Sequence, residues 1–179
     1  MTNIRKKYQE TVVPAIKKNF NLSNDLEVPR LQKVVVNSGV GKALNNSKFI
    51  EMVTSGLERI TGQHPIIRKA KKSVSGFKIR QGMTVGLQVT LRGSRMEEFI
   101  DRLVNITLPR VRDFRGLDPA SFGQSGNYTM GIKEHTVFPE TQSDDLDKAF
   151  GMEITVVTST KNAEQGLALL KGLGFPFQQ

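Results

Sequence analysis

The chain has 179 residues, with 26 lysines and arginines against 17 aspartates and glutamates, and a formal net charge of +9. It contains no cysteine and two histidines, which excludes disulfide frameworks, thiolate catalysis and sulfur-based zinc sites and nearly excludes a histidine metal cage. No run of about 18 apolar residues and no signal-peptide core occurs, so we expect a soluble, cytosolic protein. The length suits a single domain over residues 1–179.

Proline, glycine and the spacing of apolar residues predict the first helices and strands. Residues 3–20 are typical of a helix with a basic face, which Pro14 should kink or restart because proline lacks an amide donor. A β-branched run predicts a strand over residues 31–37, ended by Gly39. Apolar side chains at helical spacing then predict a helix over residues 47–61.

The second half continues with a strand over Val85–Arg92, in which apolar and polar residues alternate strictly. An apolar stripe from Met96 to Val104 predicts a helix. Two strands, Tyr128–Ile132 and Met152–Thr158, precede a last helix over Ala163–Leu173. The order is helix, strand, helix, strand, strand, helix, strand, strand, helix. It indicates an α+β fold, with a largely antiparallel sheet, helices packed on one face and the other face open.

Polar residues at a period of two occur in two of these strands. We place them together on the open face: Lys33, Asn37, Gln88, Thr90 and Arg92. Hydrogen-bonding side chains on a sheet, flanked by positive charge, favour a nucleic-acid platform. The alternative is an ordinary solvated sheet face.

Positive charge is concentrated in the first half. Residues 1–95 carry 18 basic and 5 acidic side chains, or +13, whereas residues 96–179 carry 8 and 12, or −4. The densest stretch is Arg68–Arg80, a loop of sequence RKAKKSVSGFKIR with six basic residues and no acidic one. Such a loop neutralises phosphates, and Phe77 can stack on an unpaired base. A solvated loop with Phe77 folded back onto the core is the alternative.

Catalysis has little support in the sequence. Gly39-Val40-Gly41-Lys42 fails the phosphate-loop pattern, which requires a glycine at Val36 and a hydroxyl residue at Ala43. Neither His64 nor His135 has an evident catalytic partner.

An acidic cluster of Asp144, Asp145 and Asp147 can hold magnesium through carboxylate oxygens, or can be a helix start or a solvated turn. A nucleic-acid-processing enzyme that uses this cluster is the second hypothesis, and a nonspecific RNA-coating protein is the third.

Taken together, the motifs resemble the family of large-subunit ribosomal protein five, which attaches 5S rRNA to the bacterial ribosome. The resemblance covers essentially the whole chain. It rests on Val28–Leu31, Lys33–Asn37, Gly39–Gly41, Thr61–Gln63, Arg68–Ser73, Phe77–Arg80, Gly86-Leu87, Val89–Arg92, Leu108–Arg110, Asp113–Leu117, Phe138–Glu140 and Gly172–Phe177.

The resemblance implies a non-catalytic RNA-binding protein without cofactor or metal, bound to the cytoplasmic ribosome in the central protuberance of the large subunit. Asn37, Gln63 and Thr90 match polar positions that contact 5S rRNA, with Lys33 and Arg92 as electrostatic neighbours. Periodicity does not single out Gln63.

Further contacts follow from the resemblance. The basic loop would contact peptidyl-site tRNA through Arg68, Lys69, Lys71, Lys72, Ser73, Phe77, Lys78 and Arg80. A bridge to small-subunit ribosomal protein thirteen would use loops around Arg110–Gly116 and Glu134–Asp145, with Arg110, Arg112, Asp113, Arg115 and Glu134 as candidates. Large-subunit rRNA and other proteins of the central protuberance are the remaining expected partners.

Overall fold

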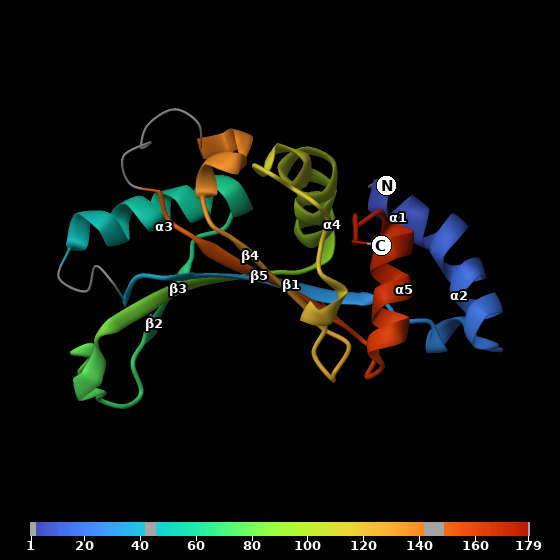
Figure 1. Ribbon diagram of the computed structural model, residues 1–179, viewed down its shortest axis with the longest axis horizontal. Coiled ribbons are helices and arrows are strands. Elements are labelled where there is room, and N and C mark those ends of the chain that lie inside the picture. Colours follow the sequence, from blue (N-terminus) through green and yellow to red (C-terminus); the bar gives the residue numbers. More distant parts are fainter. Residues whose placement is uncertain (1–2, 42–45, 142–148, 179) are drawn as a thin grey trace. The chain divides into compact units, whose positions relative to one another are not determined.

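The computed structural model describes residues 3–41, 46–141 and 149–178. Helices and strands follow the predicted order, and the fold is α+β (Figure 1). The chain forms two compact units. The first unit contains Met1–Val34, Leu91–Met130 and Thr155–Gln179, and the second contains Val35–Thr90 and Gly131–Ile154. No helix within the described ranges is long and apolar enough to cross a membrane.

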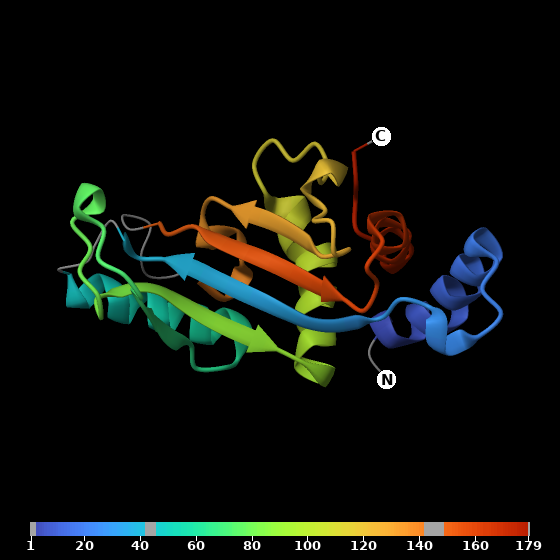
Figure 2. The same ribbon diagram turned by 90° about the horizontal axis from the view of Figure 1, so that it is seen from below.

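The strands form one five-stranded sheet in the order β2-β3-β1-β5-β4. Neighbouring strands run in opposite directions (Figure 2). Predictions for the last two strands are correct to the residue, β1 runs two residues longer than predicted, and β3 lies one residue earlier. The bounds are Leu31–Gly39 for β1, Ile66–Lys69 for β2, Thr84–Leu91 for β3, Tyr128–Ile132 for β4 and Met152–Thr158 for β5.

Strand β2 occupies the start of the segment that we expected to be a loop. Arg68 and Lys69 lie in this strand, so the loop prediction was wrong for these two residues. β2 pairs with β3 in antiparallel register, with Ile66 opposite Gln88 and Arg68 opposite Gly86. All four β2 residues are exposed. They therefore lack the alternation of buried and exposed positions by which a strand is recognised.

In the second unit, α3 (Ser47–Thr61) lies along one side of the sheet (Figure 1). Asn46 begins it by accepting a hydrogen bond from the Phe49 amide through its side chain, and Gly62 ends it in the left-handed conformation at φ 65°. The apolar side chains Val53, Leu57 and Ile60 of α3 are fully buried, whereas Phe49 near its start is half-buried. The inward side chains of the strands are buried as well, including Val36, Leu87, Val89 and Ile154.

The first unit begins with the helix that we expected Pro14 to kink or restart. Here α1 (Asn3–Lys7) passes through a π-helical turn, Tyr8–Val12, into α2 (Val13–Phe20). The amide of Val13 donates to the Tyr8 carbonyl five residues earlier. A wider turn here is expected because Pro14 has no N–H for the regular ladder. The structure thus shows a new α-helix that begins at Val13, immediately before Pro14.

Two further helices complete the first unit. α4 (Gly93–Arg102) continues through a π-helical turn, Leu103–Thr107, and a 3-10 turn, Leu108–Arg110. α5 (Ala163–Leu173) has the predicted bounds. Its glycines allow close packing: a Cβ at Gly172 would stand 2.9 Å from Val12, and one at Gly166 would stand 2.7 Å from the Gly126 carbonyl oxygen.

An aromatic cluster fixes the C-terminal segment within the first unit. Tyr128 lies 4.7 Å from Phe122 and 5.3 Å from Phe177, measured between ring centroids. The Tyr128 hydroxyl donates to the Asp118 carbonyl at 3.1 Å. Burial, with a smaller contribution from the negative charge of Asp118, raises the pKa of Tyr128 to about 12.

Candidate nucleic-acid interface

The sheet face opposite α3 in the second unit carries a row of polar side chains, and we call it the open face. Burial alternates along both central strands: Val36 and Ser38 are buried around half-buried Asn37, and Leu87 and Val89 are buried around half-buried Gln88. Thr90 is half-buried on the same side as Gln88. A strand's side chains point alternately to its two faces. Asn37, Gln88 and Thr90 therefore face away from the core.

Gly86 determines how closely Asn37 lies against β3. A Cβ built at Gly86 would stand 3.6 Å from the Asn37 side-chain oxygen and 3.3 Å from the Ser38 carbonyl oxygen. The absence of a side chain at this position thus leaves room for Asn37 to lie beside the neighbouring strand. The geometry holds the amide at the surface of the open face.

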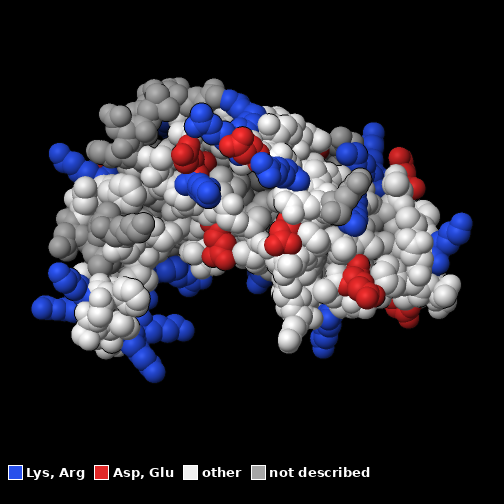
Figure 3. Space-filling model, viewed as in Figure 1, with Lys and Arg blue, Asp and Glu red and all other residues white. Residues whose placement is uncertain are grey.

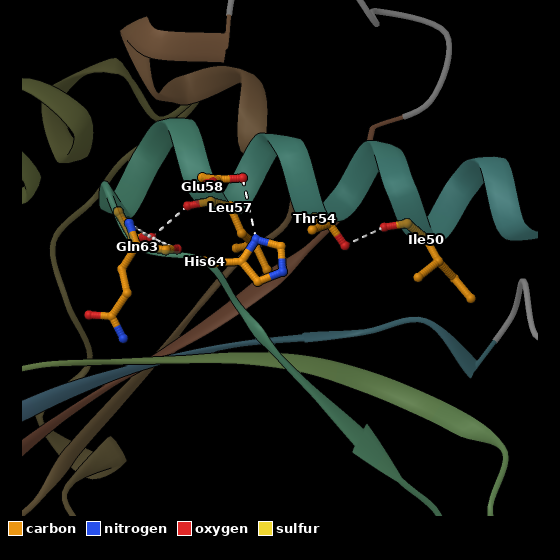
Figure 4. A network of polar contacts seen from close by, with 7 residues as sticks. Ile50, Thr54, Leu57, Glu58, Gln63 and His64 are labelled. Carbon is orange, nitrogen blue, oxygen red and sulfur yellow. Dashed lines mark hydrogen bonds and ion pairs between the residues drawn. The ribbon is translucent and has the colours of Figure 1, made fainter.

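Gln63 follows α3 in the turn that leads to β2. The Thr61 hydroxyl donates to the Leu57 carbonyl at 2.7 Å, and the backbone N–H of Gln63 donates to that hydroxyl at 3.3 Å. Figure 4 shows the Gln63 side chain pointing away from α3. Periodicity missed Gln63 because it lies outside any strand or helix; the preceding helix-ending glycine was the available signal.

The basic segment forms a hairpin with a structured tip. Val74 and Ile79 pair across it, with amide-to-carbonyl distances of 2.9 and 3.1 Å. A 3-10 turn at Ser75–Phe77 leads to Lys78, whose φ is 54°. Phe77 is 75% exposed, so the alternative in which it folds back onto the core is excluded.

The predicted tRNA-contacting residues are all exposed side chains of this hairpin: Arg68, Lys69, Lys71, Lys72, Ser73, Phe77, Lys78 and Arg80. Lys and Arg side chains gather at the lower left of Figure 3, where Figure 1 shows the hairpin. No Asp or Glu appears there in that view. The hairpin is therefore a concentrated positive surface.

Arg68 is the one basic residue of the segment that is fixed on the sheet. Its Nε donates to the Gln88 side-chain oxygen at 2.6 Å, across the β2–β3 pair. The contact links a residue that we predicted for the loop with one that we predicted for the open face.

The remaining predicted residues lie in other places. Lys33 and Arg92 belong to the first unit, where Lys33 is half-buried on β1 and exposed Arg92 directly precedes α4. The bridge candidates of the first unit are exposed within a single segment: Arg110, Arg112, Asp113 and Arg115. Glu134 is exposed in the second unit, before the 3-10 turn His135–Val137.

The described residues form no arrangement that supports the catalytic alternatives. Four of the residues considered for catalysis or metal binding lie outside the described residues: Lys42, Asp144, Asp145 and Asp147. Within the described ranges, no group of three acidic, histidine or cysteine side chains is arranged to hold a metal ion. His135 is buried and stacks on Phe150 with ring centroids 4.0 Å apart, which is a packing role.

Comparisons with known proteins identify the family. A model described as ribosomal protein L5 matches residues 24–80, and a second model, for the C-terminus of the same ribosomal family, matches residues 84–177. The chain belongs to the ribosomal protein L5 family. It is a structural, non-enzymatic constituent of the large ribosomal subunit, which excludes the nucleic-acid-processing enzyme and confirms the resemblance seen in the sequence.

Relatives of the L5 family match this chain over nearly its whole length. Large ribosomal subunit protein uL5 of Carboxydothermus hydrogenoformans is 50% identical over 179 residues and covers 100% of both chains. The Streptococcus thermophilus protein is 51% identical over 174 residues, 97% of each chain. That of Kocuria rhizophila is 53% identical over 172 residues, 96% of this chain and 91% of the relative.

The two L5 family models divide the chain differently from its compact units. The models meet between residues 80 and 84, whereas each unit takes segments from both sides of that boundary. That residues 1–179 behave as one domain stays a prediction.

Proposed function

We propose that the open face binds 5S rRNA and helps to attach it to the central protuberance of the large subunit. The observation that carries this proposal is a set of three polar side chains, Asn37, Gln63 and Thr90. They are half-buried, and they make no side-chain hydrogen bond to any residue that the structure describes. Half-exposed amides and hydroxyls that bond no other side chain of the protein can bond a polar ligand instead.

Charge supports an RNA ligand on one part of the sheet. Strands β2, β3 and β1 contain no Asp or Glu, and residues 59–96 contain none at all. β5, which neighbours β1, carries the exposed Glu153. Because a carboxylate repels phosphate, we place the limit of the RNA contact at β5. Lys33 and Arg92 add salt-dependent affinity.

The test is binding of a 5S rRNA transcript across a salt series, with excess structured RNA of equal length as competitor. We expect a specific complex whose log affinity falls linearly with log salt. The double variant Asn37→Ala with Thr90→Ala should weaken binding about 100-fold, since each lost hydrogen bond costs about 1–1.5 kcal/mol. Unchanged affinity in the folded variant would refute the assignment.

A matched control uses the hydroxyl pair Thr129 and Thr155, which face each other at 3.1 Å in the first unit. Replacing both by alanine removes two polar groups without leaving either unpaired, and should leave 5S rRNA binding unchanged. Competition that abolishes all binding at every salt would instead identify a nonspecific RNA coat.

The exposed hairpin supports a second contact, with peptidyl-site tRNA. Lys71 and Lys72 are exposed in the hairpin, and Phe77 is available for stacking. We expect Lys71→Ala with Lys72→Ala to impair tRNA placement on reconstituted ribosomes and to spare 5S rRNA binding. Equal losses in both assays would show one continuous electrostatic surface.

We also propose that exposed side chains around Arg110–Gly116, together with Glu134, contact small-subunit ribosomal protein thirteen, and that the chain contacts large-subunit rRNA and neighbouring proteins of the central protuberance. The mixed charges of Arg112, Asp113 and Arg115 suit a protein partner better than a phosphate backbone. Crosslinking from Arg112 replaced by a photoreactive residue in intact ribosomes tests the contact with protein thirteen.

A further inference from the structure

We propose that Arg68 and Gln88 form a phosphate-binding subsite of the open face, which engages one backbone phosphate of the bound 5S rRNA. The inference rests on the function proposed above and extends the RNA contact from β1 and β3 to the edge strand β2. It takes Arg68 out of the tRNA-contacting set and assigns it to the sheet.

The register of β2 and β3 places the pair on the open face. Gln88 lies on that face, between the buried Leu87 and Val89. Its direct cross-strand partner is Ile66, and Arg68 is the partner of Gly86 two residues away. Cross-strand partners share a face of the sheet. Arg68 and Ile66 therefore face the same side as Gln88.

The hydrogen bond between the two side chains orients the guanidinium. Arginine has five N–H donors in a planar fork, and at Arg68 the Nε–H is used by the Gln88 oxygen at 2.6 Å. The N–H groups on the two Nη atoms remain for a ligand. They can engage two oxygens of one phosphate in parallel, the strongest form of this contact.

The surroundings favour an anion at this place. Arg68 makes no ion pair with any residue that the structure describes, and no carboxylate occurs between Glu58 and Glu97. Ile66 is 59% exposed on the same face. Because its side-chain partner is a neutral amide and not a carboxylate, Arg68 can pair with a phosphate, and ribose can cover the exposed aliphatic surface beside it.

The decisive experiment measures the affinity of wild-type and variant full-length chains for the 5S rRNA transcript over a salt series. Arg68→Ala should lower affinity by about tenfold and reduce the slope of log affinity against log salt by about 1, because one phosphate contact is lost. Gln88→Ala should lower affinity about threefold without changing the slope, since the cation stays and only its orientation is lost. Arg68→Lys should also keep the slope and lose the bidentate contact.

The control for charge alone is Lys48→Ala. Lys48 is exposed on α3, which covers the other face of the sheet, and its loss changes the net charge by the same amount. Phosphate-ethylation interference gives a second readout. Ethylation of one particular 5S rRNA phosphate should weaken binding of the wild type and should have no effect on binding of Arg68→Ala.

The outcomes separate this inference from the proposed function. If Asn37→Ala with Thr90→Ala loses binding while Arg68→Ala matches Lys48→Ala, the subsite is refuted and the open-face proposal stands. If neither change weakens binding by folded variants, both are refuted. If Arg68→Ala impairs tRNA placement alone, Arg68 belongs to the hairpin surface and the subsite is refuted.

Discussion

Replacing Gly86 by alanine separates the stability of the sheet from its binding of RNA. The added methyl group would stand 3.3 Å from the Ser38 carbonyl oxygen and 3.6 Å from the Asn37 side-chain oxygen. The first contact is tight, so the neighbouring strand must give way by a few tenths of an ångström. Asn37 directly precedes Ser38 on β1, so its side chain shifts with that strand.

The expected change in stability is small because two effects oppose each other. Alanine in a strand interior gains about 0.5–1 kcal/mol over glycine from the lower entropy of the unfolded chain. Mild overpacking costs about 1 kcal/mol. The net change in the free energy of unfolding should stay within about 1 kcal/mol, equivalent to at most about 4 °C in Tm for a chain of this size.

Binding should change more than stability. If the Asn37 amide is displaced from its place on the open face, the loss of one hydrogen bond to RNA costs about 1.5 kcal/mol, or about tenfold in affinity. The assays are thermal unfolding and 5S rRNA binding at fixed salt, run on the same preparations.

Gly131→Ala is the matched control. Gly131 is an exposed strand glycine of the same unit, and a Cβ there would meet no atom within 4 Å. We expect it to retain full affinity. If Gly86→Ala folds and binds as tightly as Gly131→Ala, then RNA binding does not depend on the position of Asn37 and the reasoning is refuted.

Three other predictions concern the fold. The free energy of unfolding of the wild type should fall from pH 10 towards pH 12, because tyrosine ionises near pH 10 in the unfolded chain whereas buried Tyr128 has a pKa of about 12. Urea titrations at each pH should show that the free energy of unfolding of Tyr128→Phe falls less steeply over this range. Equal slopes for the two chains would contradict this prediction. Burial also raises the pKa of Tyr8, but both chains retain Tyr8. Gly166→Ala should lower the free energy of unfolding by about 1–2 kcal/mol despite the better helix propensity of alanine, since the added Cβ would stand 2.7 Å from the Gly126 carbonyl oxygen. The control Ser55→Ala, at an exposed position of α3, should be neutral or stabilising. A urea midpoint raised by Gly166→Ala would contradict the steric argument. Calorimetry should show one transition with equal calorimetric and van't Hoff enthalpies, and two transitions would mean that the compact units unfold separately.

Local sequence determined most of the elements. Strict alternation in β3 and the β-branched run in β1 predicted strands whose ends were displaced by two residues at most. The bounds of α3 were correct because Asn46 and Gly62 provide a side-chain cap and a left-handed ending. These signals are local: each depends on interactions between residues near one another in the chain.

Resemblance contributed what periodicity did not. Gln63 lies in a turn, where side-chain direction follows from the path of the chain and not from a repeat, so only its match to a family motif identified it. The basic segment was recognised from its charge, although its first two residues proved to be strand. Charge density is a property of composition and does not depend on which element carries the residues.

Tertiary structure alone decided which side chains meet. The pairing of Ile66 with Gln88, and hence the contact between Arg68 and Gln88, depends on strand register. Register is set by hydrogen bonds between segments about 20 residues apart and by packing against the core, which no local pattern in Ile66–Lys69 reports. The sequence thus predicted a polar, basic face, and only the folded sheet showed that Arg68 belongs to it.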